Sequence, residues 1–286
     1  MTEGKLLKDK VSIITGGSMG IGKAIASTFA KEGSHLVLTS RTRSYLEATK
    51  RQLEGFGPRV EIFRADVSQE KEVRSLVDFT LKEFGDINIL ANCAGIYGPI
   101  GFMTDLGSNK WLEAIKINLF GTFLCIKAVL PVMIKNRKGK IINLSGGGAA
   151  SPFPRFSAYA TSKAGVVRLT ETIAEEVKEY NVDVNAIAPG TVNTRLLEQA
   201  LQAGEAAGKS FLAKAIKQKQ EGSVPPEKVA ELAVFLASSK TDGLTGRLIS
   251  LLWDNWKEIP QHLDDIVSSD IYTLRRIIPK ERGYDW

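Results

Sequence analysis

Two residues four positions apart, Tyr159 and Lys163, have side chains that can do proton chemistry together. Apolar residues around them recur at helical spacing, and positions i and i+4 lie on the same face of a helix. A cation held beside a phenol stabilises the phenolate and lowers the phenol pKa from about 10 towards neutrality. Such a phenol suits a general acid for the reduction of a carbonyl group. The same pair also occurs on ordinary surface helices, so other motifs must decide between the two interpretations.

A second motif lies near the start of the chain, where an expected strand at 11–15 runs directly into a glycine-rich turn that opens a helix. Glycines permit a tight turn and let backbone N–H groups approach a pyrophosphate at a helix N-terminus. We therefore predict a dinucleotide-binding loop, with an ordinary strand-to-helix turn as the alternative. Its cofactor-binding residues would be Gly16, Ser18, Met19, Gly20, Ile21 and Gly22.

The elements that position these motifs alternate along the chain. We expect strands at 11–15, 35–40, 60–64, 87–91, 140–144, 182–188 and 248–252. Helices are expected at 20–32, 44–54, 69–84, 111–135, 158–179 and 226–237. This alternation predicts an α/β fold, a doubly wound parallel sheet of about seven strands with helices on both faces.

Two regions fall outside the alternation. Residues 194–222 form a long helical insertion, which we expect to act as a lid over a substrate pocket. Residues 251–286 form an aromatic-rich extension, which we expect to pack on the domain, on the lid or on a neighbouring subunit. The chain would then be one domain, 1–250, with a C-terminal extension.

Composition excludes several classes of protein. The 286 residues carry a net charge of +6 and are 43% hydrophobic, enough for one large core. Cys93 and Cys125 sit in apolar surroundings and make no disulfide framework, which favours a reduced, cytoplasmic protein. His35 and His262 lack ligand-like neighbours, so no metal site is expected. No secretory signal, nucleic-acid motif or apolar run of the roughly 18 residues of a membrane span is visible.

Over about residues 6–250 the chain resembles a classical short-chain dehydrogenase/reductase. The motifs that carry the resemblance are the glycine loop at 15–22, Asp66, Asn92-Cys93-Ala94-Gly95, Asn118, Tyr159 with Lys163, and the stretch 189–194. Any one of these motifs can occur by chance in an unrelated sequence, but all of them together in this order are specific for the family. The resemblance implies a Rossmann-type fold and an NAD(P)-dependent oxidoreductase that transfers hydride between the nucleotide and a carbonyl or alcohol.

The resemblance also implies residue roles. Tyr159 would protonate the carbonyl oxygen, Lys163 would lower the phenol pKa and hold the nicotinamide ribose, and Asn118 would anchor a proton-relaying water. The other matched residues would contact the nucleotide: Asp66 and Val67 at the adenine, Asn92, Ala94 and Gly95 at the sheet and ribose, and Pro189, Gly190, Val192 and Thr194 at the nicotinamide. Structural alternatives are a helix N-cap for Asp66, a helix kink for Asn118 and an ordinary turn for 189–194.

The catalytic serine is where the match departs from the family, in which it usually lies thirteen residues before the tyrosine. That position is Gly146, and the nearest hydroxyl is Ser145, one residue earlier. A glycine-rich bulge would bring Ser145 into the site, so we predict Ser145 as the catalytic serine. Ser151, Ser157 or catalysis without a serine are the alternatives.

Cofactor preference follows from charge. An NAD-selective site places a carboxylate at the end of the second strand to bind the ribose 2′-OH. That strand ends instead before Arg41 and Arg43, whose guanidinium groups match a 2′-phosphate. Met19 occupies a place where a basic residue is common, so only one of two usual determinants is present. We predict NADPH as the preferred cofactor, with NAD possible.

The substrate pocket should be walled by the residues after the fourth strand, by 152–156 and by the insertion. Its aromatic and aliphatic content suits an apolar or ring-shaped small molecule, such as a 3-oxoacyl group or another ketone. Four lysines in the insertion and the aromatic extension favour a sugar or nucleotide-sugar ketoreductase as the alternative. A non-catalytic cofactor-binding scaffold is a third hypothesis. The resemblance implies a homo-tetramer or homo-dimer.

Overall fold

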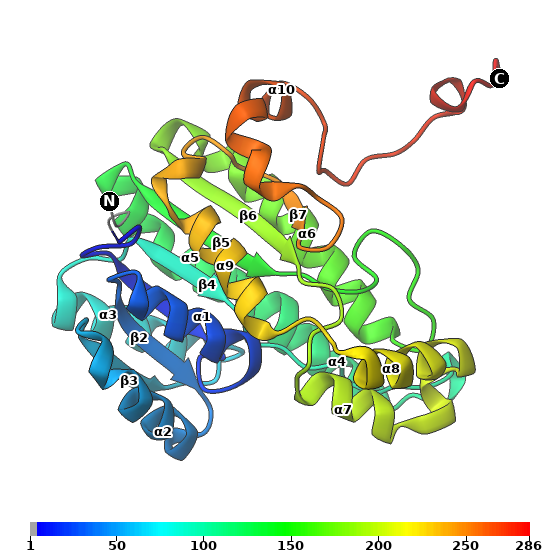
Figure 1. Ribbon diagram of the computed structural model, residues 1–286, viewed down its shortest axis with the longest axis horizontal. Helices are drawn as coiled ribbons and strands as arrows, with labels where there is room; N and C mark the ends of the chain where they lie inside the picture. The colour runs from blue at the N-terminus through cyan, green and yellow to red at the C-terminus, as the bar shows by residue number, and fades with distance from the viewer. Residues whose placement is uncertain (1–4) are drawn as a thin grey trace.

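Parallel strands form one sheet in the order β3-β2-β1-β4-β5-β6-β7 in the computed structural model, which describes residues 5–286 (Figure 1). The strands are β1 (Val11–Thr15), β2 (His35–Ser40), β3 (Val60–Arg64), β4 (Ile89–Asn92), β5 (Gly139–Leu144), β6 (Val182–Ala188) and β7 (Leu248–Ser250). The strand order reverses between β1 and β4. In open α/β sheets ligands bind at such a switch point, outside the carboxyl ends of the strands.

Helices cover both faces of this sheet (Figure 1). They are α1 (Gly20–Lys31), α2 (Arg43–Leu53), α3 (Glu70–Phe84), α4 (Ser108–Ile115), α5 (Gly121–Asn136), α6 (Ser157–Val177), α7 (Arg195–Gln202), α8 (Lys209–Glu221), α9 (Pro226–Ala237) and α10 (Leu263–Val267). Helices α1 and α9 pack on one face, while α3, α5 and α6 pack on the other. The predicted doubly wound fold is therefore confirmed.

The inner strands of the sheet are buried because they are mostly apolar on both sides, whereas the edge strand β3 is only partly buried. All five residues of β1 are buried, and adjacent residues serve opposite layers. Ile14 packs in the core under α1 and α9, whereas Ile13 packs in the core under α3 and α5. This division follows from the two-residue period of a strand.

Several element boundaries differ from the sequence prediction, most of them by one residue. Strand β4 begins two residues later than the expected 87, and β7 ends at Ser250 because the chain turns there. The helix expected at 111–135 runs over Ser108–Asn136 as α4, a π-helical turn (η3, Lys116–Phe120) and α5. By length and composition this helix could span a membrane, contrary to the prediction, but half of its apolar window is buried in the protein, as in a core helix.

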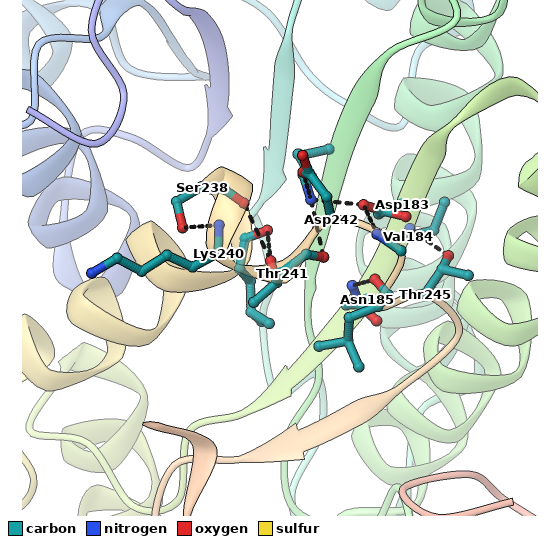
Figure 2. A network of polar contacts seen from close by, with 12 residues as sticks. Asp183, Val184, Asn185, Ser238, Lys240, Thr241, Asp242 and Thr245 are labelled. Carbon is teal, nitrogen blue, oxygen red and sulfur yellow. Dashed lines mark hydrogen bonds and ion pairs between the residues drawn. The ribbon is translucent and has the colours of Figure 1, made fainter. Parts of the chain in front are cut away.

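A polar network fixes the end of the sheet opposite the glycine loop (Figure 2). Lys140 Nζ lies 2.7 Å from Asp183 Oδ2 and 2.8 Å from Asp242 Oδ1, and it donates to the carbonyl of Thr241 at 3.1 Å. Asn185 Nδ2 donates to the carbonyl of Leu244 at 2.7 Å. These contacts tie β5 and β6 to the connection between α9 and β7.

The first part of the C-terminal extension packs on its own domain. Ile259 and Ile266 are buried in the core under α1 and α9, and the Trp256 ring lies 5.1 Å from that of Phe235 on α9. The guanidinium of Arg247 donates to the carbonyls of Val267, Ser269 and Ile271. Beyond residue 274 the chain leaves the domain as an extended segment (Figure 1).

Candidate active site

The glycine loop joins β1 to α1 at the switch point of the sheet. A methyl group at Gly22 would lie 2.4 Å from the carbonyl oxygen of Gly16, so only glycine permits this turn. No side chain caps α1, whose N-cap residue is Met19. The first N–H groups of α1 are therefore directed at the space in front of the helix, which is the arrangement that binds phosphate.

A cavity of about 660 Å³ runs along this loop. It is lined from four directions, by the glycine loop, the end of β2, the ends of β3 and β4, and the start of α7. Thr15 Oγ1 joins the loop to the neighbouring strand by accepting from the N–H groups of Cys93 and Ala94 at 3.0 and 3.1 Å. The cavity is large enough for a cofactor-sized ligand, and its phosphate-binding turn suits a dinucleotide.

Tyr159 and Lys163 lie one helical turn apart on α6, and both are buried. Lys163 Nζ is 5.6 Å from the centre of the Tyr159 ring and donates to the carbonyl of Leu144 at 2.6 Å. That carbonyl is at the end of β5, so the ammonium is held between helix and sheet.

Asn118 lies in the π-helical turn η3, a feature that often marks a functional position. Its Oδ1 accepts from the N–H of Ile96 at 2.8 Å, and its Nδ2 donates to the carbonyl of Ile96 at 2.8 Å and to Ser162 Oγ at 2.9 Å. A Cβ atom at Gly95 would lie 3.2 Å from Asn118 Oδ1 and 3.6 Å from Lys163 Nζ. The Asn118 amide and the Lys163 ammonium therefore both lie beside Gly95.

Burial dominates the proton affinities of the pair. It raises the pKa of Tyr159 above its ordinary value, and the neighbouring Tyr97 phenol raises it further. Burial lowers the pKa of Lys163 to about 8. In the chain by itself these two causes act against the predicted lowering, and the effect of Lys163 on the phenol with a nucleotide bound stays a prediction.

The two candidate serine positions have different surroundings. Ser145 continues the β5 ladder through its N–H, which donates to the carbonyl of Ile187 at 2.9 Å, and within residues 5–286 its buried Oγ has no hydrogen-bond partner. A Cβ atom at Gly146 would lie 2.2 Å from Tyr159 Oη, so position 146 faces the phenol. The catalytic role of Ser145 stays a prediction, without support from this geometry.

Comparison with known proteins identifies the family of this chain. The model of the short chain dehydrogenase family matches residues 10–204. The chain belongs to the short-chain dehydrogenase family. The 3-oxoacyl-[acyl-carrier-protein] reductase FabG of Thermotoga maritima is 33% identical over 245 residues, which cover 86% of this chain and 97% of the relative. Glucose 1-dehydrogenase 2 of Bacillus subtilis is 35% identical over 85% of this chain and 93% of its own length.

Solved structures agree with this family assignment. Levodione reductase superposes with a TM-score of 0.79 at 29% identity, covering 85% of this chain and 96% of the other. NAD+-bound xylitol dehydrogenase gives 0.80 at 29% identity, covering 85% and 98%. This short-chain dehydrogenase is an NAD(P)-dependent oxidoreductase, acting by hydride transfer between a nicotinamide nucleotide and a carbonyl or alcohol.

The structure brings most predicted nucleotide contacts of this dehydrogenase to one cavity. Those that line it are Gly16, Ser18, Met19, Gly20, Ile21, Gly22, Arg41, Asp66, Val67, Ala94, Gly95 and Thr194. Outside it lie Asn92, Tyr159, Lys163, Pro189, Gly190 and Val192. Asn92 Nδ2 donates to Asn143 Oδ1 at 2.9 Å, and the side chain of Leu252 covers Gly190. Arg43 is also outside, in an ion pair with Glu47 at 2.8 Å.

Sequence reasoning missed several residues that line the cavity of this dehydrogenase. Tyr45, in the first turn of α2, contributes to its walls, as do Arg195, Glu198 and Gln199 on α7. Their positions depend on how α2 and α7 pack relative to the glycine loop, and no local sequence pattern predicts this packing. Arg195 alone carried a signal, because it opens a helix directly after the predicted nicotinamide segment.

Proposed function

We propose that this dehydrogenase works as an NADPH-dependent ketone reductase, with Tyr159 as proton donor and Lys163 and Asn118 as its supporting residues. The observation that carries the proposal is the convergence of the buried phenol, the buried ammonium and the π-turn amide beside the dinucleotide-sized cavity. The glycine loop and Asp66 would hold the nucleotide, which supplies the hydride when bound.

Protonation favours reduction as the working direction. Because burial and Tyr97 raise the phenol pKa, Tyr159 carries its proton when a carbonyl arrives. Oxidation of an alcohol would instead require the phenolate at the start. Lys163 would stabilise the phenolate that each reduction leaves, and Asn118 would hold the water through which the proton returns.

NADPH preference rests on Arg41, which lines the cavity at the end of β2. Arg64 donates to the backbone carbonyl of Arg41 at 3.1 Å, so a second guanidinium lies beside the same turn. A 2′-phosphate in the cavity would gain from the charge of Arg41. The xylitol dehydrogenase of similar structure is NAD+-bound, so we propose the preference for this chain on these local charges alone.

The aromatic surroundings of Tyr159 support an apolar ketone as substrate. Phe153, Phe156 and Phe211 pack together beside the phenol, and Phe211 comes from α8 in the insertion. The four lysines of that insertion are exposed, as expected for the solvent face of a helix (they are Lys209, Lys214, Lys217 and Lys219). The sugar or nucleotide-sugar alternative therefore gains nothing from them.

We also propose a cytoplasmic enzyme that assembles as a homo-dimer or homo-tetramer. The relatives named above are bacterial enzymes. Phe120 and Phe123 remain exposed on the helix pair that carries Asn118, which offers apolar surface for a second copy.

Turnover of a carbonyl panel tests the proposal. Diacetyl, a 3-oxoacyl thioester and levodione would be supplied with NADPH or NADH, and glucose and xylitol with the oxidised nucleotides. We expect reduction of at least one ketone, faster with NADPH, and a loss of about 10³-fold in kcat for Tyr159→Phe. Oxidation of the sugars alone, or equal kcat/KM for NADPH and NADH, would contradict the proposal.

A further inference from the structure

Tyr97 is a half-buried phenol beside Tyr159 to which the mechanism above gives no role. The two rings meet edge to face with their centres 4.7 Å apart, and the Tyr97 ring also contacts Phe156 at 5.1 Å. Within residues 5–286, no side chain or backbone group accepts or donates a hydrogen bond at the Tyr97 hydroxyl. The hydroxyl is not among the fully enclosed unpaired groups of these residues, so it remains open to a bound ligand.

The backbone before Tyr97 is held firmly. Asn118 pairs with both the N–H and the carbonyl of Ile96, at 2.8 Å each, so the residue next to Tyr97 cannot shift without breaking two hydrogen bonds. The amide that sits in the π-helical turn therefore positions the second phenol as well as the neighbourhood of Lys163.

At position 146, after the end of β5, the chain has a glycine and so offers no hydroxyl to the Tyr159 phenol. Position 146 faces Tyr159 Oη but is glycine, and within residues 5–286 the buried Oγ of Ser145 has no hydrogen-bond partner. A carbonyl oxygen that gains negative charge is stabilised best by more than one hydrogen-bond donor. Two described rings contact the Tyr159 ring, those of Tyr97 and Phe153, and Tyr97 is the one that carries a hydroxyl.

We propose that the Tyr97 hydroxyl donates the second hydrogen bond to the carbonyl oxygen of the substrate, next to Tyr159, in place of a side chain at position 146. Tyr159 gives its proton to that oxygen, whereas Tyr97 keeps its own and only stabilises the charge. Burial raises the pKa of Tyr97 to about 12, so its hydroxyl remains a neutral donor over the working range of pH. The proposal rests on the reductase function proposed above.

Tyr97→Phe is the decisive variant, because it removes one oxygen and keeps the ring in its packing. Using the ketone that wild type reduces, we expect kcat/KM to fall about 10–100-fold, mostly in kcat, with the Kd for NADPH and the melting temperature unchanged. Tyr180→Phe, on a turn after α6 where the ring contacts Arg137, is the matched control and should behave as wild type.

Two further variants separate hydroxyl from packing. Tyr97→Leu should be no more than a few-fold worse than Tyr97→Phe if the hydroxyl carries the effect. A Tyr97→Phe enzyme with wild-type kcat/KM would overturn the proposal, whether Tyr97→Leu is impaired or not. Loss of activity in Ser145→Ala together with full activity in Tyr97→Phe would overturn it in favour of Ser145. If wild type itself reduced no ketone of the panel, the proposed function would fail, and this proposal with it.

Discussion

At the scale of single residues, the site depends on a phenol and an ammonium that the protein has removed from water. The sequence pairs Tyr159 with Lys163, but it cannot show that both are buried, and burial raises the Tyr159 pKa in the chain by itself. The phenol is therefore protonated before a nucleotide binds.

The burial of Lys163 can be tested through the pH dependence of kcat/KM. Burial lowers the pKa of its ammonium to about 8, so the group is charged below that pH and neutral above it. Since kcat/KM reports groups of the free enzyme, we expect kcat/KM for ketone reduction to fall as the pH rises through about 8. A matched profile for Lys178→Arg, on the exposed turn after α6, should be unchanged. A wild-type profile that stays flat well above pH 8 would contradict the lowered pKa.

At the scale of elements, α6 and the glycine loop could be predicted because each has a local cause. Helical spacing places Tyr159 above Lys163, and the strand before Gly16 and the helix after it define the loop. The contact of Tyr97 with Tyr159 could not be predicted from the sequence, because the loop after β4 and the start of α6 meet only in the folded chain. The role of Ser145 could not be predicted either, because it depends on where a single side chain lies just after the end of β5.

Lys140 ties two strands to a loop, so its loss should affect stability rather than catalysis. Lys140→Met leaves Asp183 buried without its cation, and the pKa of that carboxyl is already raised by burial. We expect the free energy of unfolding in denaturant to fall by about 3 kcal/mol, with the Kd for NADPH unchanged. Lys228→Met breaks an exposed pair with Glu231 and should cost less than about 1 kcal/mol. Equal losses in the two variants would show that the network in Figure 2 is no stronger than a surface pair.

At the scale of the whole molecule, one sheet serves both the nucleotide site and the C-terminal extension. Leu252 covers Gly190, and the N–H of Leu248 donates to the carbonyl of Tyr272 at 2.8 Å, so the extension is joined to β7 and to the predicted nicotinamide segment. The sequence indicated that the aromatic extension must pack, but not that Arg247 would hold it through backbone carbonyls.

The segment after residue 274 should be where the extension meets a neighbouring subunit. It leaves the domain in Figure 1, and it exposes Ile277, Ile278, Tyr284 and Trp286. Truncation after Leu274 keeps every buried part of the extension, so we expect an unchanged melting temperature but a smaller oligomer by light scattering. Full-length and truncated chains of the same oligomeric state would contradict this, and a lower melting temperature alone would assign the segment to the domain.

The most direct test of the account follows a labelled hydride and its proton donor together. NADPH carrying deuterium on the reactive carbon of its nicotinamide ring would be mixed with a reducible ketone and the enzyme. We expect the label on the former carbonyl carbon of the alcohol product, formed about 10³-fold faster by wild type than by Tyr159→Phe. Transfer at equal rates in the two enzymes, or no labelled alcohol from wild type, would contradict the central claim that Tyr159 donates the proton in ketone reduction.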